Sequence, residues 1–173
     1  MKLSIAQLQG LAIAHQFPDP PLAAAIAFAE SGGDTGIVGD VKIGGSVGLW
    51  QVYLPSHRNY DPAKLIDPDY NAKAAFDISS GGKNWHPWST YHMVPDPTAP
   101  GKQIEVGDGN GAFKPYYKPG LTPIPWVPPP LTLPPPFPPV PVATVVGGAA
   151  AAFALAAVGA FVATVEYRDR SGY

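Results

Sequence analysis

A mainly α-helical domain is predicted for residues 1–93, followed by a proline-rich linker and one transmembrane helix. Three stretches within the first 93 residues are rich in apolar residues and end at glycine or proline, as expected for short packed helices. Residues 115–141 carry 13 prolines, and residues 142–165 carry no charged side chain. With 46% of the whole chain hydrophobic, a packed core is feasible.

The first two predicted helices lie close together. Residues 3–16 have apolar positions near helical spacing and end at the Pro-rich stretch that begins at Phe17. The next helix runs from Leu22 to Glu30, with Pro21 in its first turn and Gly32 just past its end. It is far shorter than the about 20 residues that span a bilayer, so we expect a buried central helix.

A glycine-rich loop and a third helix follow. Seven of the eighteen residues from 31 to 48 are glycine, and Leu49–Tyr53 reads equally as a short strand or as the start of a helix. Asp67 and Pro68 predict a helix entry, and Gly81 with Gly82 predicts its end. Its expected apolar face consists of Ala72, Ala75, Phe76 and Ile78.

The remaining chain is predicted to be non-globular. Residues 94–114 are expected to be irregular, and residues 115–141 are expected to form an extended polyproline linker of roughly 80 Å. Residues 142–165 would make a helix of roughly 36 Å, long enough to cross a membrane, with residues 166–173 as a charged tail. The N-terminus lacks the unbroken apolar stretch of a secretory signal, so none is expected.

Composition excludes several function classes. The net charge is -2 and no basic stripe occurs, so nucleic acid is not an expected partner. The chain has no cysteine, which excludes disulfides and thiolate metal sites. The four histidines show no recognisable metal-binding spacing, and the glycines near residue 45 lack the Lys-Ser/Thr end of a phosphate loop. We therefore expect no cofactor and no metal.

Glu30 is the candidate catalytic residue. It ends a nearly unbroken apolar run, and a carboxyl group in such surroundings has a raised pKa that suits it to deliver a proton near neutral pH. The alternative is an ordinary helix-end glutamate that points into solvent.

Four motifs occur in a fixed order around Glu30. They are Glu30-Ser31-Gly32-Gly33, Gly48-Leu49-Trp50-Gln51, Asp67-Pro68 with Asn71-Ala72, and Trp85 through Tyr91. Over roughly residues 5–92 this set resembles the transglycosylase SLT domain of the lysozyme-like superfamily, especially the variant of phage tail and virion proteins. The resemblance implies a mainly α, lysozyme-like fold and cleavage of the β-1,4 bond between N-acetylmuramic acid and N-acetylglucosamine.

The same resemblance implies the reaction and the substrate groove. One glutamate, here Glu30, would protonate the glycosidic oxygen and then take the proton from the C6 hydroxyl, giving a 1,6-anhydro sugar. Tyr53 stands where many relatives carry Met. The expected substrate-binding residues are Gln51, Tyr91, Ser46, Trp50, Tyr53, Asn71 and Trp88.

Several of these assignments have alternatives. Trp50 fits the core as well as the groove, Gln51 could cap a turn, and Asn71 could hold the active-site backbone. Tyr91 is expected to turn its hydroxyl toward Glu30, and Trp88 suits sugar stacking. Trp85 fits the core better. Asp34 and Asp40 could each act as the second acid of a hydrolase, although turn roles fit them better.

The domain order suggests a biological setting. A wall-cleaving domain tethered to a C-terminal membrane helix suits a virion protein held in the internal membrane of a phage and used during entry; a bacterial cell membrane is the alternative location. Expected partners are peptidoglycan strands, a lipid membrane through residues 142–165, and capsid or membrane proteins of the particle. The rival functions are a lysozyme-type muramidase, a non-catalytic wall-binding virion protein, and a holin-like membrane protein.

Overall fold

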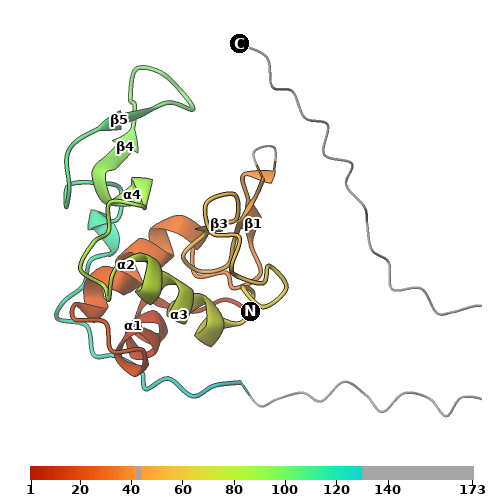
Figure 1. Ribbon diagram of the computed structural model, residues 1–173. Coiled ribbons are helices and arrows are strands. Elements are labelled where there is room, and N and C mark those ends of the chain that lie inside the picture. Colours follow the sequence, from red (N-terminus) through yellow and green to blue (C-terminus); the bar gives the residue numbers. More distant parts are fainter. Residues whose placement is uncertain (42–43, 130–173) are drawn as a thin grey trace, which may run out of the picture. The chain divides into compact units, whose positions relative to one another are not determined.

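The computed structural model describes residues 1–41 and 44–129. The helices are α1 (Ile5–Ala14), α2 (Pro20–Ser31), α3 (Pro68–Ile78), the single-turn α4 (Ser89–His92) and the 3₁₀ helix η2 (Lys114–Tyr116). The strands are β1 (Val38–Gly39), β2 (Ser46–Val47), β3 (Val52–Tyr53), β4 (Met93–Pro95) and β5 (Gln103–Glu105). Figure 1 shows β1 and β3 on one side of the helices and the β4–β5 hairpin on another.

Local sequence sets the helix ends. Ser4 caps α1, with its hydroxyl accepting from the backbone N–H of Gln7 and the Gln7 side chain returning a bond to the backbone of Ser4. Asp19 caps α2 through the N–H of Leu22, and two prolines fill its first turn. Asp67 caps α3 in the same way through Tyr70. The three predicted long helices are therefore confirmed, with ends shifted by one or two residues.

Helix α2 lies at the centre of the packing. It contacts α1, α4 and η2, and its residues from Ala23 to Ala27 are completely buried. The run of small alanines lets these neighbours approach α2 closely. Gly32, with φ of 60°, ends the helix in the left-handed conformation that glycine adopts without strain. Because Glu30 lies two residues before Gly32, the fixed end of the helix also fixes the position of the Glu30 side chain.

The glycine-rich region folds into a small antiparallel sheet. Strands β1, β2 and β3 lie in that order, with Val38 opposite Val47 and Ser46 opposite Tyr53. Of the two readings of Leu49–Tyr53, the strand is correct for Val52 and Tyr53, whereas residues 49–51 form a turn. Strands β1 and β2 were not predicted, since strands of two residues are too short to leave a periodic pattern.

An aromatic cluster joins the helices to this sheet. Phe17 stacks on Trp50 and on Trp85, each at 5.7 Å between ring centroids, and meets Phe76 edge-on at 5.3 Å. Trp50 is fully buried and Trp85 nearly so. These aromatic residues fill the space that the small side chains of α2 leave open.

Packing continues beyond residue 93, where the sequence analysis placed the domain boundary. Residues 94–114 were expected to be irregular, but β4 pairs with β5 and Phe113 is buried in the core. The start of the expected polyproline linker also packs on the helices: the N–H of Ile124 donates to the carbonyl of Ala6 at 3.0 Å. Residues 1–130 form one compact unit.

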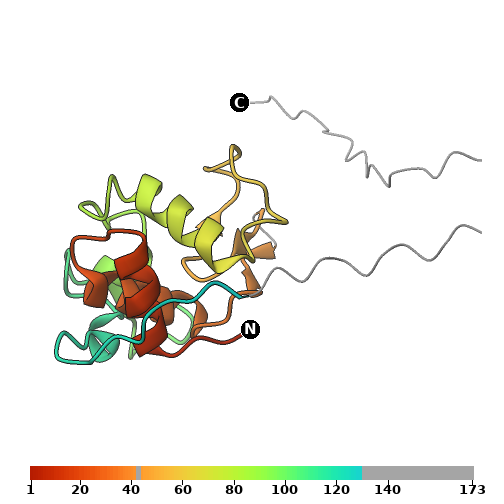
Figure 2. The same ribbon diagram turned by 90° about the horizontal axis from the view of Figure 1, so that it is seen from below.

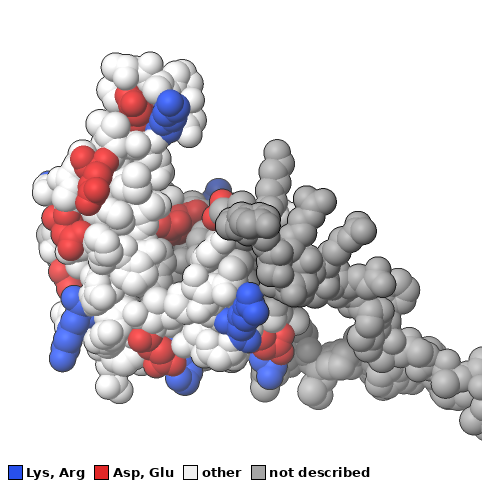
Figure 3. Space-filling model, turned by 45° about the horizontal axis from the view of Figure 1, so that its top comes forward, with Lys and Arg blue, Asp and Glu red and all other residues white. Residues whose placement is uncertain are grey.

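The predicted transmembrane helix at 142–165, its charged tail and the end of the linker lie outside the described residues. Within the part of the chain that is described, no helix is both long and apolar enough to span a membrane. On the face drawn in Figure 3, lysine and arginine side chains are scattered among acidic ones rather than gathered into a patch.

Candidate active site

A cleft of about 700 Å³ opens beside the end of α2. One wall comes from the three-stranded sheet and the loop after it; the other comes from residues 87–90 and from the β4–β5 hairpin. The polar residues that line it are Glu30, Asp40, Ser46, Gln51, Tyr53, His57, Ser89, Thr90 and Gln103. The cleft therefore combines one partly buried carboxyl group with many hydrogen-bonding groups, as recognition of a hydroxyl-rich ligand requires.

Glu30 lies in this cleft rather than in open solvent. The hydroxyl of Thr90 donates a hydrogen bond of 2.7 Å to its Oε1. Burial raises the pKa of Glu30 above its ordinary value of 4.5, and the negative charge of Asp40 raises it further. The hydroxyl and backbone N–H of Thr90 act in the opposite direction. Desolvation is the largest of these influences, so the pKa of Glu30 is raised overall.

The position of Glu30 on its helix works in the same direction. It is the penultimate residue of α2, close to the negative end of the helix dipole. A charged carboxylate at this negative end is unfavourable, so the helix dipole also favours the neutral form of Glu30. Glu30 lines the cleft and accepts from Thr90, so its side chain does not point into open solvent as the alternative expected.

Thr90, not Tyr91, is the hydroxyl that meets Glu30. The ring of Tyr91 stacks on Phe113 at 5.6 Å and does not line the cleft. Thr90 and Tyr91 are neighbours on the single turn of α4, so their side chains point in different directions. The prediction for Tyr91 is corrected for this reason: Phe113, from the segment after β5, provides an apolar surface for its ring.

Ser46 and Gln51 do line the cleft, as the sequence analysis expected. The hydroxyl of Ser46 donates to Asp40 Oδ2 at 3.0 Å, which holds that carboxylate at the cleft wall. Gln51 donates its amide N–H groups to the carbonyls of Gly48 and Ile37. The predicted turn-capping role of Gln51 is thus present, and its carbonyl oxygen is the amide atom left to accept from a sugar hydroxyl.

Tyr53 and Trp88 also border the cleft, in different ways. Tyr53 is half-buried on β3. Trp88 is only 5% exposed, and its indole N–H donates to the carbonyl of Trp50 at 2.6 Å. An indole so buried forms the floor of the cleft, so the expectation of an open stacking platform is corrected.

Trp50 and Asn71 are structural residues, which corrects their assignment to substrate binding. Both are completely buried and neither lines the cleft. Asn71 Oδ1 accepts from the backbone N–H of Trp50, while Nδ2 donates to the carbonyls of Val47 and Leu65. The Trp50 indole donates to the carbonyl of Ala23. Asn71 thereby holds the loop between β2 and β3 against α3. This is the positioning role that was the alternative to substrate binding.

The cleft also contains residues that the sequence analysis missed or set aside. Asp40 is a cleft residue, whereas Asp34 caps its own turn by accepting from the N–H of Gly36. His57 and Gln103 line the cleft from segments with no motif of their own. Only Asp40 had a sequence signal, namely its closeness to Glu30 in the chain. Away from the cleft, His86, His92 and Asp108 form a group of possible metal ligands that their spacing did not reveal.

Comparison with known families adds to this geometry. The model of a family described as a lysozyme-like domain matches residues 14–90. This stretch is similar to a lysozyme-like domain. It includes Glu30, the three-stranded sheet and Thr90, whereas the β4–β5 hairpin and η2 lie beyond it. No curated protein and no solved structure matches the chain.

The lysozyme-like domain supports the general prediction of a peptidoglycan-cleaving enzyme with peptidoglycan as its substrate. Its matched range ends at Thr90, the hydroxyl bonded to Glu30. The far wall of the cleft is therefore built partly by chain outside the lysozyme-like domain.

Proposed function

We propose that this protein is a lytic transglycosylase that cleaves the β-1,4 bond between N-acetylmuramic acid and N-acetylglucosamine, with Glu30 as its only acid/base. One observation carries the proposal: a glutamate with a raised pKa projects into a polar cleft and is held by a hydroxyl group. Such a residue can give and take a proton near neutral pH.

The first step breaks the glycosidic bond. The Thr90 hydroxyl donates to Oε1 of Glu30, which favours the acidic proton on Oε2. That proton passes to the bridging oxygen as its bond to C1 of the muramic acid breaks. The acetamido group of the substrate stabilises the positive charge that develops at C1, as in substrate-assisted glycosidases.

The second step closes the anhydro ring. Glu30, now a carboxylate, takes the proton from the C6 hydroxyl while that oxygen bonds to C1. The enzyme is thus returned to its protonated form without consuming water. A single carboxyl group suffices because the same proton site acts as acid and then as base.

A muramidase is the second candidate, and Asp40 is the observation that favours it. Its carboxylate lines the same cleft as Glu30 and is held there by Ser46. In a hydrolase, a second carboxylate would act as a nucleophile or activate water. The two candidates differ in product: a transglycosylase leaves 1,6-anhydro ends, and a hydrolase leaves reducing ends.

The test is digestion of purified peptidoglycan by the full chain, with the fragments identified by mass. We expect anhydro ends from the wild type and at least a 100-fold lower rate from Glu30→Gln. Glu105→Gln is the matched control, since Glu105 is an exposed glutamate on β5. Equal rates for Glu30→Gln and the wild type would leave only a wall-binding module.

Asp40→Asn separates the two candidate reactions. For the transglycosylase we expect a rate within a few-fold of wild type, because Asp40 affects Glu30 only through charge. For a hydrolase that uses Asp40, the rate would fall at least 100-fold and the products would carry reducing ends.

We further propose that residues 142–165 anchor the enzyme in a membrane, and that the setting is the internal membrane of a phage particle used during entry. The support is the sequence pattern alone: an uncharged stretch of 24 residues behind a proline-rich segment. Membrane fractionation of the full chain and of a chain ending at residue 141 tests the anchor. Recovery of both in the soluble fraction would remove it, and absence from purified particles would remove the virion role.

A further inference from the structure

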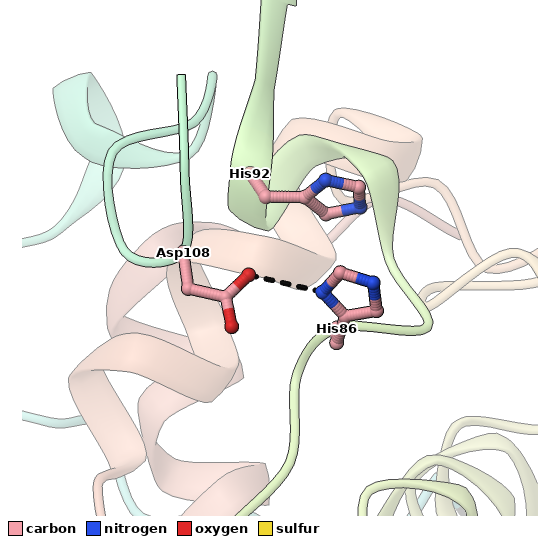
Figure 4. Close-up of side chains that lie close together, drawn as sticks. All are labelled: His86, His92 and Asp108. Atoms are coloured by element: carbon pink, nitrogen blue, oxygen red, sulfur yellow. Dashed lines mark hydrogen bonds and ion pairs between the residues drawn. The ribbon is translucent and has the colours of Figure 1, made fainter. Parts of the chain in front are cut away.

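Two histidines and an aspartate meet at the edge of the β4–β5 hairpin, away from the cleft. His86 comes from the loop before α4, His92 ends α4, and Asp108 lies in the turn after β5. One ligand atom from each lies within 4.8 Å of the others. Figure 4 shows the three side chains close together on three separate segments, with the carboxylate of Asp108 turned toward His86.

We propose that these three side chains form a Zn²⁺ site. Two imidazoles and one carboxylate are the donor set that zinc accepts in sites with three protein ligands and one water. Nδ1 of His86 lies 3.0 Å from Asp108 Oδ1, close to the separation of about 3.3 Å between ligands of a tetrahedral zinc ion. Closing the site then requires movement of side chains, not of the backbone.

The ring of His92 provides a second, independent observation. It lies nearly parallel to the His86 ring, at 4.5 Å between centroids, and its Nδ1 is buried without a hydrogen-bond partner among the described residues. A buried ring nitrogen without a partner is unfavourable. In Figure 4 the ring edge that carries Nδ1 faces away from His86. Rotation of about 180° about the Cβ–Cγ bond exchanges this nitrogen with Cδ2 and turns it toward the other two ligands, where a cation would satisfy it.

The backbone around the cluster is already held in place. The N–H of Val106 donates to the carbonyl of His92 at 2.8 Å, and that of Gly111 donates to the carbonyl of Tyr91 at 3.0 Å. His86 and Asp108 themselves are about 60% exposed, so a cation can reach them from solvent. Zinc bound here would tie the turn after β5 to the end of α4, the helix that carries Thr90. The site is separate from the proposed active site and does not depend on its reaction.

Zinc titration of the chelator-treated full chain tests the site. We expect one tight equivalent, a higher unfolding temperature with zinc, and a tetrahedral absorption spectrum with Co²⁺. Ca²⁺ and Mg²⁺, which prefer oxygen ligands, should have no such effect. His86→Gln and Asp108→Asn change exposed side chains and should weaken zinc binding at least about 100-fold, since loss of even an outer-shell partner costs roughly 10–100-fold.

His15→Gln is the matched control, because His15 pairs with Asp69 at 2.9 Å in the other histidine–carboxylate pair of the described residues. It should leave zinc affinity unchanged. Wild-type zinc affinity no higher than that of His86→Gln and Asp108→Asn would overturn the proposal. Equal loss in His15→Gln would also overturn it, since the zinc would then bind histidines without selecting this site.

Discussion

At the scale of single residues, the site depends on opposing influences on one carboxyl group. Burial, the end of α2 and the charge of Asp40 all favour a protonated Glu30. The hydroxyl and N–H of Thr90 favour the carboxylate. An acid/base that must both give and take a proton needs this balance, since a pKa far from the working pH would slow one of its two steps.

Thr90→Val should shift this balance in a defined direction. The substitution removes the hydroxyl that donates to Glu30 Oε1 but keeps the side-chain shape. Because that bond lowers the pKa of Glu30, its loss should raise the pKa further above the ordinary 4.5. The first step needs the protonated acid, so the decline of kcat/KM at high pH should move to higher pH. A pH–rate profile on peptidoglycan measures the shift.

Thr98→Val is the control for this experiment, since Thr98 donates to Asp96 in the hairpin tip and does not line the cleft. Its profile should coincide with that of the wild type. If Thr90→Val left the high-pH limb in place, or moved it to lower pH, Glu30 would not be the group that titrates in that limb.

At the scale of elements, the cleft is assembled from segments that are distant in sequence. The sheet β1–β3 provides Ser46 and Tyr53, α2 provides Glu30, and the β4–β5 hairpin provides Gln103. The hairpin lies outside the matched lysozyme-like range of residues 14–90. It therefore adds to the wall of the cleft a contact that the matched domain does not contain.

Gln103→Ala should weaken substrate binding with little effect on the chemical step. Gln103 lines the cleft but is not bonded to Glu30, so its amide can contribute about one hydrogen bond to the glycan. Losing a bond of about 0.5–1.5 kcal/mol corresponds to a roughly 2- to 13-fold rise in KM. Steady-state kinetics on soluble glycan fragments would show this rise. Lys102→Ala, next in sequence and outside the cleft, should change neither constant; a large fall in kcat for Gln103→Ala would assign Gln103 to the chemistry instead.

The long helices were predictable because their signals are local. Asp19 and Asp67 mark the starts of α2 and α3, Gly32 marks the end of α2, and the structure uses all three as caps. The two-residue strands have no such signal. Their register depends on Asn71, a residue of α3 whose side chain holds the loop between them. Tertiary contacts of this kind leave no periodic pattern in the chain.

The residues of the candidate site likewise fall into those that local sequence predicts and those that depend on tertiary contacts. Glu30 was found because its apolar helix and its motif are contiguous in sequence. Thr90 was not, because the choice between it and Tyr91 depends on Phe113, more than twenty residues later in the chain. The buried roles of Trp50 and Asn71 likewise depend on partners in other elements. Sequence motifs gave the correct neighbourhood but not the direction of each side chain.

At the scale of the described molecule, residues 117–127 form a strap across the helices. Gln9 donates to the carbonyl of Lys118, Ile124 donates to that of Ala6, and the Trp126 indole donates to Asp69 on α3. Figure 2 shows this segment running along α1. Prolines in the strap do not prevent packing, because an extended segment can use the few N–H groups it has to bond a helix edge.

Gly10 makes this close approach possible, so Gly10→Ala should destabilise the protein. A Cβ at Gly10 would lie 1.7 Å from the carbonyl oxygen of Ile124, which is backbone and cannot turn aside. Inside a helix, glycine to alanine normally stabilises by roughly 0.5–1 kcal/mol. Displacement of the strap should reverse that sign and lower the free energy of unfolding by about 1–3 kcal/mol. Urea unfolding followed by tryptophan fluorescence measures the change.

Gly36→Ala is the comparison that isolates the strap, since a Cβ there would meet only the Asp34 side chain at an ordinary 3.8 Å. Its free energy of unfolding should equal or slightly exceed that of the wild type. A chain that ends at residue 116 lacks the strap, so Gly10→Ala should no longer destabilise it. In that shorter chain the substitution should raise the free energy of unfolding by the roughly 0.5–1 kcal/mol that is usual inside a helix. Were Gly10→Ala stabilising in the full chain as well, the strap would not press on α1, and the packed unit would end before residue 117.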